Sequence, residues 1–400
     1  MYSVAVNRQR ESLVPYAVMA AASRSVTEAI GPAVLVSALA TSHSAAQGAL
    51  ILAGVTGLAA VGGPFIGAAM DRVRHPGRVV SIAITVLAVG VALLAILMPH
   101  APLWALLIVA SVGGMAQPAL TGGLSSQLPS LVPPDRLTRA YGVDAATYNI
   151  GAVAGPPLAA GAVILGPIGP LVFTFALLVI ALIVRPFVPF PTKAEPGVRH
   201  SLVRDVTTGF NGLLSTPSLA SATWINTIGF VGQAGFLVGV PLLVLAQQGS
   251  LAHSGWVFAA LAIGGVLGST WITYRPLGDI DRTLVAGTFA VFIALAVMTF
   301  SPNFLTTLVA AFGMGLADGP LLAATFAIRS REAPANIRSV VFTTAASIKT
   351  SLYALAAVGF GAVSDHGVGL IFGIAAALQV IALVGGKLIA DAIERKRQAN

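Results

Sequence analysis

Two charged residues stand one helical turn apart inside a long apolar run near the start of the chain. Arg24 and Glu28 interrupt the stretch AASRSVTEAIGP, in a protein of 400 residues of which only 9% are charged. At positions i and i+4 they share one face of a helix. A charge at the centre of a bilayer costs about 2.5–3.5 kcal/mol on insertion scales. If this run is a membrane helix, the two residues must pair or perform chemistry.

Other polar residues lie inside apolar runs of the same kind. They are Gln117, Asp144, Asn226, Gln233, Asp318 and Lys349. A buried carboxylate can take up and release a proton, and Glu28 is our first candidate for this role, ahead of Asp318 and Asp144. We expect Arg24 to hold Glu28 ionised until a proton or another cation displaces it, and Lys349 to do the same for Asp318. Alternatively, the two pairs only fix helix packing.

The composition indicates the class of protein that holds these residues. Hydrophobic residues make up 56% of the chain, beside 43 Gly and 24 Pro, which is too apolar for an ordinary soluble domain. Twelve apolar segments offer roughly 20 residues or more, enough to cross about 30 Å of hydrocarbon as helices. They lie at about 14–40, 46–70, 79–98, 103–128, 140–165, 168–188, 219–246, 252–274, 283–301, 304–328, 339–363 and 368–390. The sequence therefore predicts an all-α membrane protein with twelve transmembrane helices.

Lysine and arginine are distributed unevenly between the connections. The first odd-numbered connections, 41–45 and 99–102, contain neither, whereas the even-numbered connections and both ends of the chain are basic. By the positive-inside rule, both termini are expected in the cytoplasm, and we expect a multi-pass protein of the inner (cytoplasmic) membrane. This also explains the net charge of +8 without a nucleic-acid partner. Of all the lysines and arginines, only Arg24 and Lys349 fall well inside the predicted spans.

Asp144 is expected near the cytoplasmic end of the fifth predicted helix. Basic residues of the neighbouring connections, Arg72 and Arg139, are its expected partners. A structural ion pair and a functional carboxylate are equally compatible with this position.

The chain divides into two similar halves around its one long polar connection, residues 189–218. Several identities recur at an offset of 200 residues: Gly113 and Gly313, Ser130 and Ser330, Pro134 and Pro334. Each half contains six predicted spans. Parallel six-helix halves are an architecture of secondary transporters. The predicted parts are an N-terminal bundle at 1–190, a cytoplasmic linker at 191–217 with a surface helix within 199–214, and a C-terminal bundle at 218–400.

The connection after the second span reads GPFIGAAMDRVRHPGR. It resembles the signature loop of the major facilitator superfamily, with Gly67, Asp71, Arg72 and Arg78 in the matching positions and residues 74–76 inserted. The resemblance implies that Asp71 contacts the N-terminus of helix eleven and that breaking this contact favours rearrangement of the halves. Its own helix dipole disfavours an anion at this C-terminal position. Alternatively, Asp71 is a solvated loop charge.

The fifth span begins GVDAATYNIGAVAGPPLAAG. The spacing of Gly142, Gly151, Gly155 and Pro156 resembles the signature of proton-coupled drug antiporters of this superfamily, although Ala159-Ala160 replaces the usual closing Gly-Gly. Gly151 and Gly155 share a helical face and allow close packing, and Pro156 permits a bend. Alternatively, these are ordinary packing residues.

The resemblance also implies where the polar residues lie. In this superfamily, helices one, four, seven and ten line a central cavity. This places six residues around it: Arg24, Glu28, Gln117, Asn226, Gln233 and Asp318. The function implied is a proton-coupled exporter of small amphipathic or drug-like molecules that works by alternating access. The alternatives are an uptake symporter or facilitator of a small metabolite, and a non-transporting membrane sensor on the same fold.

Other chemistry has little support in the sequence. The six histidines show no metal-ligand spacing, no phosphate-binding Gly-rich loop with lysine exists, and there is no cysteine. We therefore predict no enzyme activity, no cofactor and no metal. The expected partners are the lipid bilayer, a small-molecule substrate and protons, and a monomer is expected.

Overall fold

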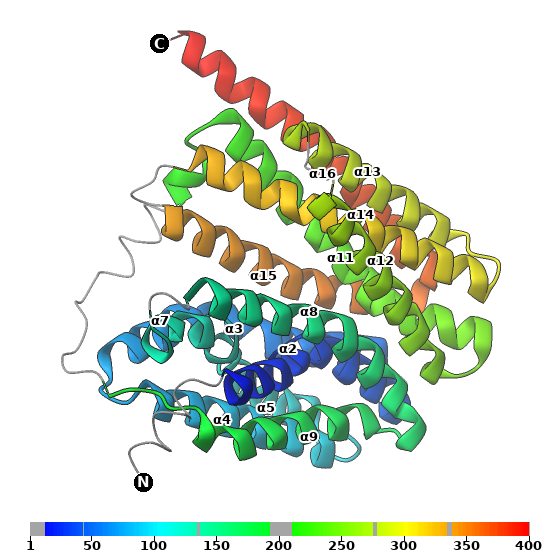
Figure 1. The fold of residues 1–400 in the computed structure, drawn as a ribbon. Helices are drawn as coiled ribbons and strands as arrows, with labels where there is room; N and C mark the ends of the chain where they lie inside the picture. The colour runs from blue at the N-terminus through cyan, green and yellow to red at the C-terminus, as the bar shows by residue number, and fades with distance from the viewer. Residues whose placement is uncertain are drawn as a thin grey trace. The chain divides into compact units, whose positions relative to one another are not determined.

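The computed structural model describes residues 13–42, 44–133, 137–192, 210–274, 278–333 and 338–399. Side chains are described for most of these residues, with 59–69 and 71–72 near the end of one helix as the main exception. Within these ranges every regular element is a helix (Figure 1). The packing of the chain divides it into two compact units, Met1–Arg199 and His200–Asn400. Each unit is described by itself below.

The described part of the first unit consists of helices joined by short connections. They are α2 (Val14–Ser42), α3 (Ala45–Arg72), α4 (Pro76–Leu97), α5 (Leu103–Gly114), the π-helix η1 (Ala119–Gly123), α6 (Leu124–Ser126), α7 (Leu128–Leu131), α8 (Leu137–Gly161) and α9 (Gly169–Val184). Short 3₁₀ turns follow α8 at Ala162–Leu165 and α9 at Arg185–Phe187.

The described part of the second unit is likewise helical. Its main helices are α11 (Pro217–Gln248), α12 (Ser254–Tyr274), α13 (Ile280–Thr299), α14 (Phe304–Glu332), α15 (Arg338–Ala362) and α16 (Val368–Ala399). Short 3₁₀ turns, Leu251–His253 and Ser364–His366, precede α12 and α16.

The predicted all-α membrane fold is confirmed. In the described part of the chain, eleven helical segments are long and apolar enough to cross a membrane, and α3 adds the apolar segment Ala45–Leu58 within its 28 residues. Each of the twelve predicted spans coincides with one helical segment. The predicted surface helix within 199–214 falls largely on residues outside the described ranges, and the predicted domain boundaries stay a prediction.

The fourth span differs from a continuous helix. Its α-helical part ends at Gly114, and a π-helical turn begins at Ala119. Pro118 lies between them and has no N–H to donate to the turn before it, which breaks an α-helix. The backbone instead makes tighter bonds, from Ala116 N to Gly113 O at 3.1 Å and from Ala119 N to Ala116 O at 3.1 Å.

Two helices that carry polar residues of the second unit, α11 and α14, have capped N-terminal ends. Thr216 caps α11 by accepting from the N–H of Leu219 at 3.2 Å, Pro217 follows at the first helical position, and Gly249 ends the helix with φ of 65°. Asn303 caps α14 by accepting from the N–H of Thr306 at 3.0 Å. Such caps satisfy backbone groups that a helix end leaves free.

Small residues set the closest helix contacts in both units, as expected where lipid supplies no hydrophobic force between helices. In the first unit, a Cβ added to Gly151 of α8 would lie 2.9 Å from the carbonyl carbon of Arg24 on α2. In the second unit, Gly232 and Gly235 of α11 lie against Ala375 of α16. Gln379 strengthens this second contact by donating to the carbonyl of Gly229 at 2.9 Å.

Candidate functional site

Arg24 is the centre of a buried polar cluster in the first unit. Its side chain exposes 0% of its surface, and Nη2 forms a salt bridge of 2.7 Å with Oδ1 of Asp144 on α8. Nη1 donates to the backbone carbonyl of Asp144 at 2.6 Å and also to the hydroxyl of Thr147. The guanidinium carbon lies 3.6 Å from the ring centroid of Tyr148. One turn of α8 therefore holds both Nη atoms of the guanidinium, while Nε has no hydrogen-bond partner in the described structure.

Two hydroxyl groups complete the shell of the Asp144 carboxylate. The Tyr16 hydroxyl of α2 donates to Oδ1, and Ser125 Oγ of α6 donates to Oδ2 at 2.8 Å. Ser125 also accepts from Nη2 of Arg24 at 2.9 Å. This group, which we call the Arg24 cluster, connects α2, α6 and α8. It consists of Tyr16, Arg24, Ser125, Asp144, Thr147 and Tyr148.

This arrangement corrects one expected pairing. Arg24 forms its salt bridge with Asp144, whereas we expected Arg24 to hold Glu28. The side chains of Arg72 and Arg139, the expected partners of Asp144, lie outside the described structure. The reason for the salt bridge is the packing of α8 on α2. Asp144 stands seven residues, two helical turns, before Gly151, so the glycine face that meets the backbone of Arg24 also brings the carboxylate to its side chain. Glu28 is exposed on the surface of its unit, outside this cluster.

Two residues expected to line a cavity make contacts between helices inside their own units. Gln117 is buried, and its Nε2 donates to the carbonyl of Val55 on α3 at 3.0 Å. Asn226 is also buried and contacts Thr325 of α14 at 3.5 Å. The structure therefore gives both amides a role in helix packing, because a buried polar group needs a partner within the protein.

Arg329 is a buried charge that the sequence analysis missed. It is 3% exposed on α14, and its Nη2 donates to Oδ1 of Asn226 at 3.3 Å. Its Nε has no hydrogen-bond partner, and no carboxylate forms an ion pair with it among the described residues. We overlooked it because it follows the predicted end of its span directly. Arg329 lies four residues after Thr325 and eleven after Asp318, so the three residues share one helical face. This spacing was the sequence signal that could have identified Arg329 as a buried residue.

The second unit carries a partly exposed polar cluster on α11, α14 and α15. Gln233 Nε2 of α11 donates to Oδ1 of Asp318 on α14 at 3.1 Å. Lys349 Nζ of α15 lies 4.0 Å from the ring centroid of Phe230 on α11. The rings of Phe230 and Tyr353 lie 4.7 Å apart at an angle of 35°. We call these five residues the α11–α15 cluster.

The structure thus brings together three predicted residues, Gln233, Asp318 and Lys349, and adds an aromatic pair that sequence reasoning missed. An aromatic residue in an apolar span does not by itself indicate a binding site. The spacing does give an indication, because Phe230 lies three residues before Gln233, and Lys349 lies four residues before Tyr353. Each aromatic residue therefore shares a helical face with a polar one. All five side chains are partly exposed, unlike the sealed Arg24 cluster.

The two signature motifs are described only in part. Gly67, Asp71 and Arg72 fall in the end of α3 whose side chains lie outside the described structure, as do the surroundings of Gly142. Arg78 is exposed in the first turn of α4. Gly155 packs on α2 like Gly151, and its Cβ would lie 2.6 Å from the carbonyl oxygen of Ser25. Pro156 lies within α8. The switching role of the loop stays a prediction.

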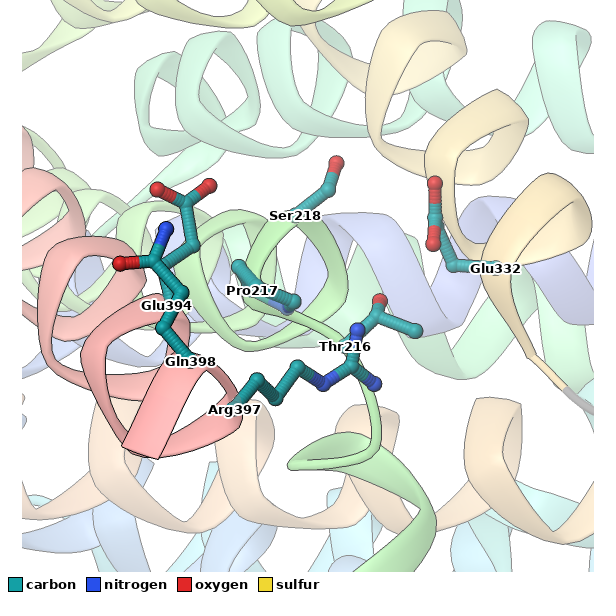
Figure 2. Close-up of a pocket in the computed structure, with 7 residues that line it drawn as sticks. All are labelled: Thr216, Pro217, Ser218, Glu332, Glu394, Arg397 and Gln398. Atoms are coloured by element: carbon teal, nitrogen blue, oxygen red, sulfur yellow. The ribbon is translucent and has the colours of Figure 1, made fainter. Parts of the chain in front are cut away.

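A separate pocket of about 400 Å³ lies at the ends of α11, α14 and α16 (Figure 2). It is lined by Thr216, Pro217, Ser218, Glu332, Glu394, Arg397 and Gln398. Figure 2 shows the three α16 residues beside the start of α11.

The neighbouring Arg331 links three segments of the second unit at this end. It pairs with Asp281 at 2.9 Å and Glu332 at 2.8 Å and donates to Ser218 at 2.9 Å. Partial burial lowers the pKa of the Arg331 guanidinium, but its hydrogen bonds to Glu332 and Asp281 outweigh this effect. The pKa of Arg331 is therefore raised. These contacts hold helix ends together.

Metal-ligating side chains do not gather anywhere in the described structure: no group of three or more His, Cys, Asp or Glu side chains is close enough to hold an ion.

The sequence pattern of most of the chain matches a known family. The model of the Major Facilitator Superfamily matches residues 16–357. The chain belongs to the major facilitator superfamily. It is therefore a membrane transporter and not an enzyme.

Three similar proteins illustrate this membership. An uncharacterised MFS-type transporter, y4rN of Sinorhizobium fredii (strain NBRC 101917 / NGR234), is 25% identical over 280 residues, which cover 68% of each chain. The solved structure of the nucleoside transporter NupG matches with a TM-score of 0.75 and 14% identity over 94% of this chain and 98% of its own. A bacterial homologue of the human lysosomal transporter Spinster matches with a TM-score of 0.71 and 13% identity over 97% and 98%. At these identities the two structures demonstrate the fold of this major facilitator protein and nothing about its substrate.

Proposed function

We propose that this major facilitator protein exports small amphipathic molecules in exchange for protons, by alternating access. The observation that carries the proposal is the α11–α15 cluster: a carboxylate, an ammonium group and two aromatic rings, all partly exposed on membrane-spanning helices. Charged groups exposed to lipid are costly, so such residues face water or a ligand. An apolar surface with a few convergent polar groups is the usual composition of a small-molecule site.

Asp318 has the properties that a proton carrier requires. Its hydrogen bond comes from the neutral amide of Gln233, and no ion pair within 4 Å involves it among the described residues. The Lys349 ammonium adds a favourable electrostatic interaction with this carboxylate. A carboxylate compensated by one neutral amide and one lysine can exchange this compensation for a proton or a cationic group. Asp144, by contrast, is committed to Arg24, Tyr16 and Ser125, and we propose a structural role for it. Glu28, exposed on α2, is the second proposed coupling carboxylate.

The proposed direction rests on α8. Gly151 and Gly155 place its backbone directly against α2, as the resemblance to the proton-coupled antiporter signature implies for a tight interface that limits leak. An uptake symporter would use the same carboxylates with substrate and proton moving together. We further propose that the protein works as a monomer in the cytoplasmic membrane, with both termini in the cytoplasm and with Asp71 in the switching loop.

The test is proton movement in proteoliposomes that contain a pH-sensitive dye. Addition of an amphipathic substrate is expected to drive protons in the opposite direction. Asp318→Asn and Glu28→Gln should each reduce this movement by at least about tenfold, while binding of the substrate persists. Asp365→Asn, an exposed aspartate in the turn before α16, is the matched control and should behave as wild type.

The outcomes separate the alternatives. Movement of substrate and protons in the same direction establishes symport and refutes export by exchange. Substrate flux without any proton movement establishes a facilitator. Wild-type proton movement in the Asp318 and Glu28 variants removes both carboxylates from the coupling mechanism.

A further inference from the structure

We propose that Arg329 is the centre of an anion-binding site in the second unit, which takes a carboxylate or phosphate group of a ligand between α11 and α14. The site consists of Arg329 on α14 and of Asn226 and Thr223 on α11. This inference goes beyond the proposed function, because it needs neither proton exchange nor a particular direction of transport.

The first step in the argument is the charge of Arg329, which is buried without a counter-charge. The residue is 3% exposed at the end of a membrane-spanning segment, and no Asp or Glu forms an ion pair with it among the described residues. Asn226 accepts from Nη2 at 3.3 Å, and Nε has no hydrogen-bond partner. A guanidinium carries five N–H donors, and their burial without acceptors is costly. An ionisable residue of this kind inside a membrane span indicates a functional site.

Arg24 shows how the same chain compensates a buried arginine with its own side chains. Asp144 supplies a carboxylate oxygen at 2.7 Å, and the hydroxyl groups of Thr147 and Ser125 accept further hydrogen bonds. At Arg329, the described structure supplies a neutral amide instead of a carboxylate. The group that this second site lacks is therefore an oxyanion, which a guanidinium binds with strong, charge-assisted hydrogen bonds.

The second step is the register of α11 against α14. Gln233 of α11 contacts Asp318 of α14 at 3.1 Å. Seven residues earlier in α11, Asn226 contacts Thr325, which stands seven residues later in α14. The two helices therefore run antiparallel, with a constant register over this stretch.

This register places a second unused donor beside Arg329. Thr223 precedes Asn226 by three residues, so it shares a face of α11 with Asn226 and stands level with the turn of α14 that carries Arg329. Its Oγ1 is buried and has no hydrogen-bond partner. Buried polar groups are normally satisfied, and a hydroxyl can donate to an oxyanion. The unused donors of Thr223 and Arg329 thus come from facing helices.

The third step is access to the site and its separation from the α11–α15 cluster. Thr223 is partly exposed, so the surface of the unit lies within about one helical turn of the site. Arg329 stands eleven residues after Asp318, which is about 16 Å along the helix axis. Anion binding at Arg329 and proton binding at Asp318 therefore involve different places on α14.

The test is the melting temperature of the purified full-length protein in phosphatidylcholine nanodiscs, titrated with benzoate or inorganic phosphate against chloride at equal ionic strength. An anion that binds the folded protein raises the melting temperature as its concentration increases. Wild type should show this rise with at least one of the two oxyanions. Arg329→Gln should weaken the binding at least about tenfold. A rise that occurs only in nanodiscs with phosphatidylglycerol, and that Arg329→Gln abolishes, assigns the same site to a lipid phosphate.

Asn226→Asp is the second variant, because it places a carboxylate of the protein where the ligand's oxyanion would bind. It should bind the anion at least about tenfold more weakly than wild type, while it stays more stable than Asn226→Leu when no anion is added. Arg331→Gln is the matched control. It removes an exposed arginine two residues further along α14 and should respond to the anions as wild type does.

The inference is overturned if neither the two oxyanions nor phosphatidylglycerol raise the melting temperature of wild type. It is also overturned if Arg329→Gln or Asn226→Asp responds as wild type does, or if Arg331→Gln loses the response as well. Because Arg329 takes no part in the proposed proton coupling, failure here leaves the proton test intact, and failure of the coupling proposal leaves anion binding interpretable.

Discussion

Removal of the Asp144 carboxylate should destabilise the protein strongly. In Asp144→Asn, the Arg24 guanidinium keeps its place but loses its only salt bridge in the described structure, at a site where Arg24 is 0% and Asp144 6% exposed. A buried charge whose partner is removed costs about 3–5 kcal/mol. A typical domain has about 5–15 kcal/mol of total stability, so this single change removes a large part of it.

The double variant provides the sharper test of this reasoning. Arg24→Met with Asp144→Leu removes both charges and fills the space with apolar groups. Replacement of a buried ion pair by apolar residues is often neutral or stabilising. We therefore expect the double variant to be more stable than Asp144→Asn alone, although Tyr16 and Ser125 lose their acceptor and reduce the recovery by about 1–3 kcal/mol.

The free energy of unfolding is measured in mild detergent by titration with a denaturing detergent, followed by circular dichroism. Arg282→Gln is the matched control. Its salt bridge with Asp279 has a similar length, 3.1 Å, but the two side chains are 88% and 48% exposed. Exposed pairs contribute about 0–1 kcal/mol. If Asp144→Asn unfolds within 1 kcal/mol of wild type, or if the double variant is no more stable than the single one, the Arg24 cluster is not a buried ion pair of the kind described.

Two further stability predictions use the same assay. Gly155→Ala should lower the free energy of unfolding by about 1–3 kcal/mol, because the added Cβ meets the Ser25 carbonyl oxygen at 2.6 Å. The control Gly161→Ala, with nothing within 4 Å of its Cβ, should be neutral or slightly stabilising. Equal effects of the two changes would show that α8 does not touch α2 as closely as described. Asn226→Leu should lower the free energy of unfolding by about 1–3 kcal/mol, because it removes the acceptor of buried Arg329. Asn226→Asp supplies a counter-charge and should lose less stability than Asn226→Leu. If Asn226→Asp is the less stable of the two variants, the charge of Arg329 is neutralised elsewhere.

Part of the candidate site was predictable from the sequence. Gln233, Asp318 and Lys349 were identified because polar residues are rare in apolar spans and costly there. Their common location on α11, α14 and α15 follows from the tertiary structure. The prediction that Arg24 pairs with Glu28 was wrong for an instructive reason: spacing along one helix identifies residues that share a face, but it does not show which other helix covers that face.

What the sequence by itself determined is the set of membrane helices. Each helix in lipid satisfies its own backbone hydrogen bonds, so length, hydropathy and the positions of proline and charge indicate where each span lies. The exact ends differ: α14 and α16 continue past the predicted spans to Glu332 and Ala399. What only the tertiary structure decided is which helix faces which, and at what rotation. Arg24 and Asp144 are 120 residues apart and meet because Gly151 and Gly155 let two backbones approach; Phe230 and Tyr353 meet across α11 and α15. Such partners depend on packing between distant segments, which the local pattern of one helix does not contain.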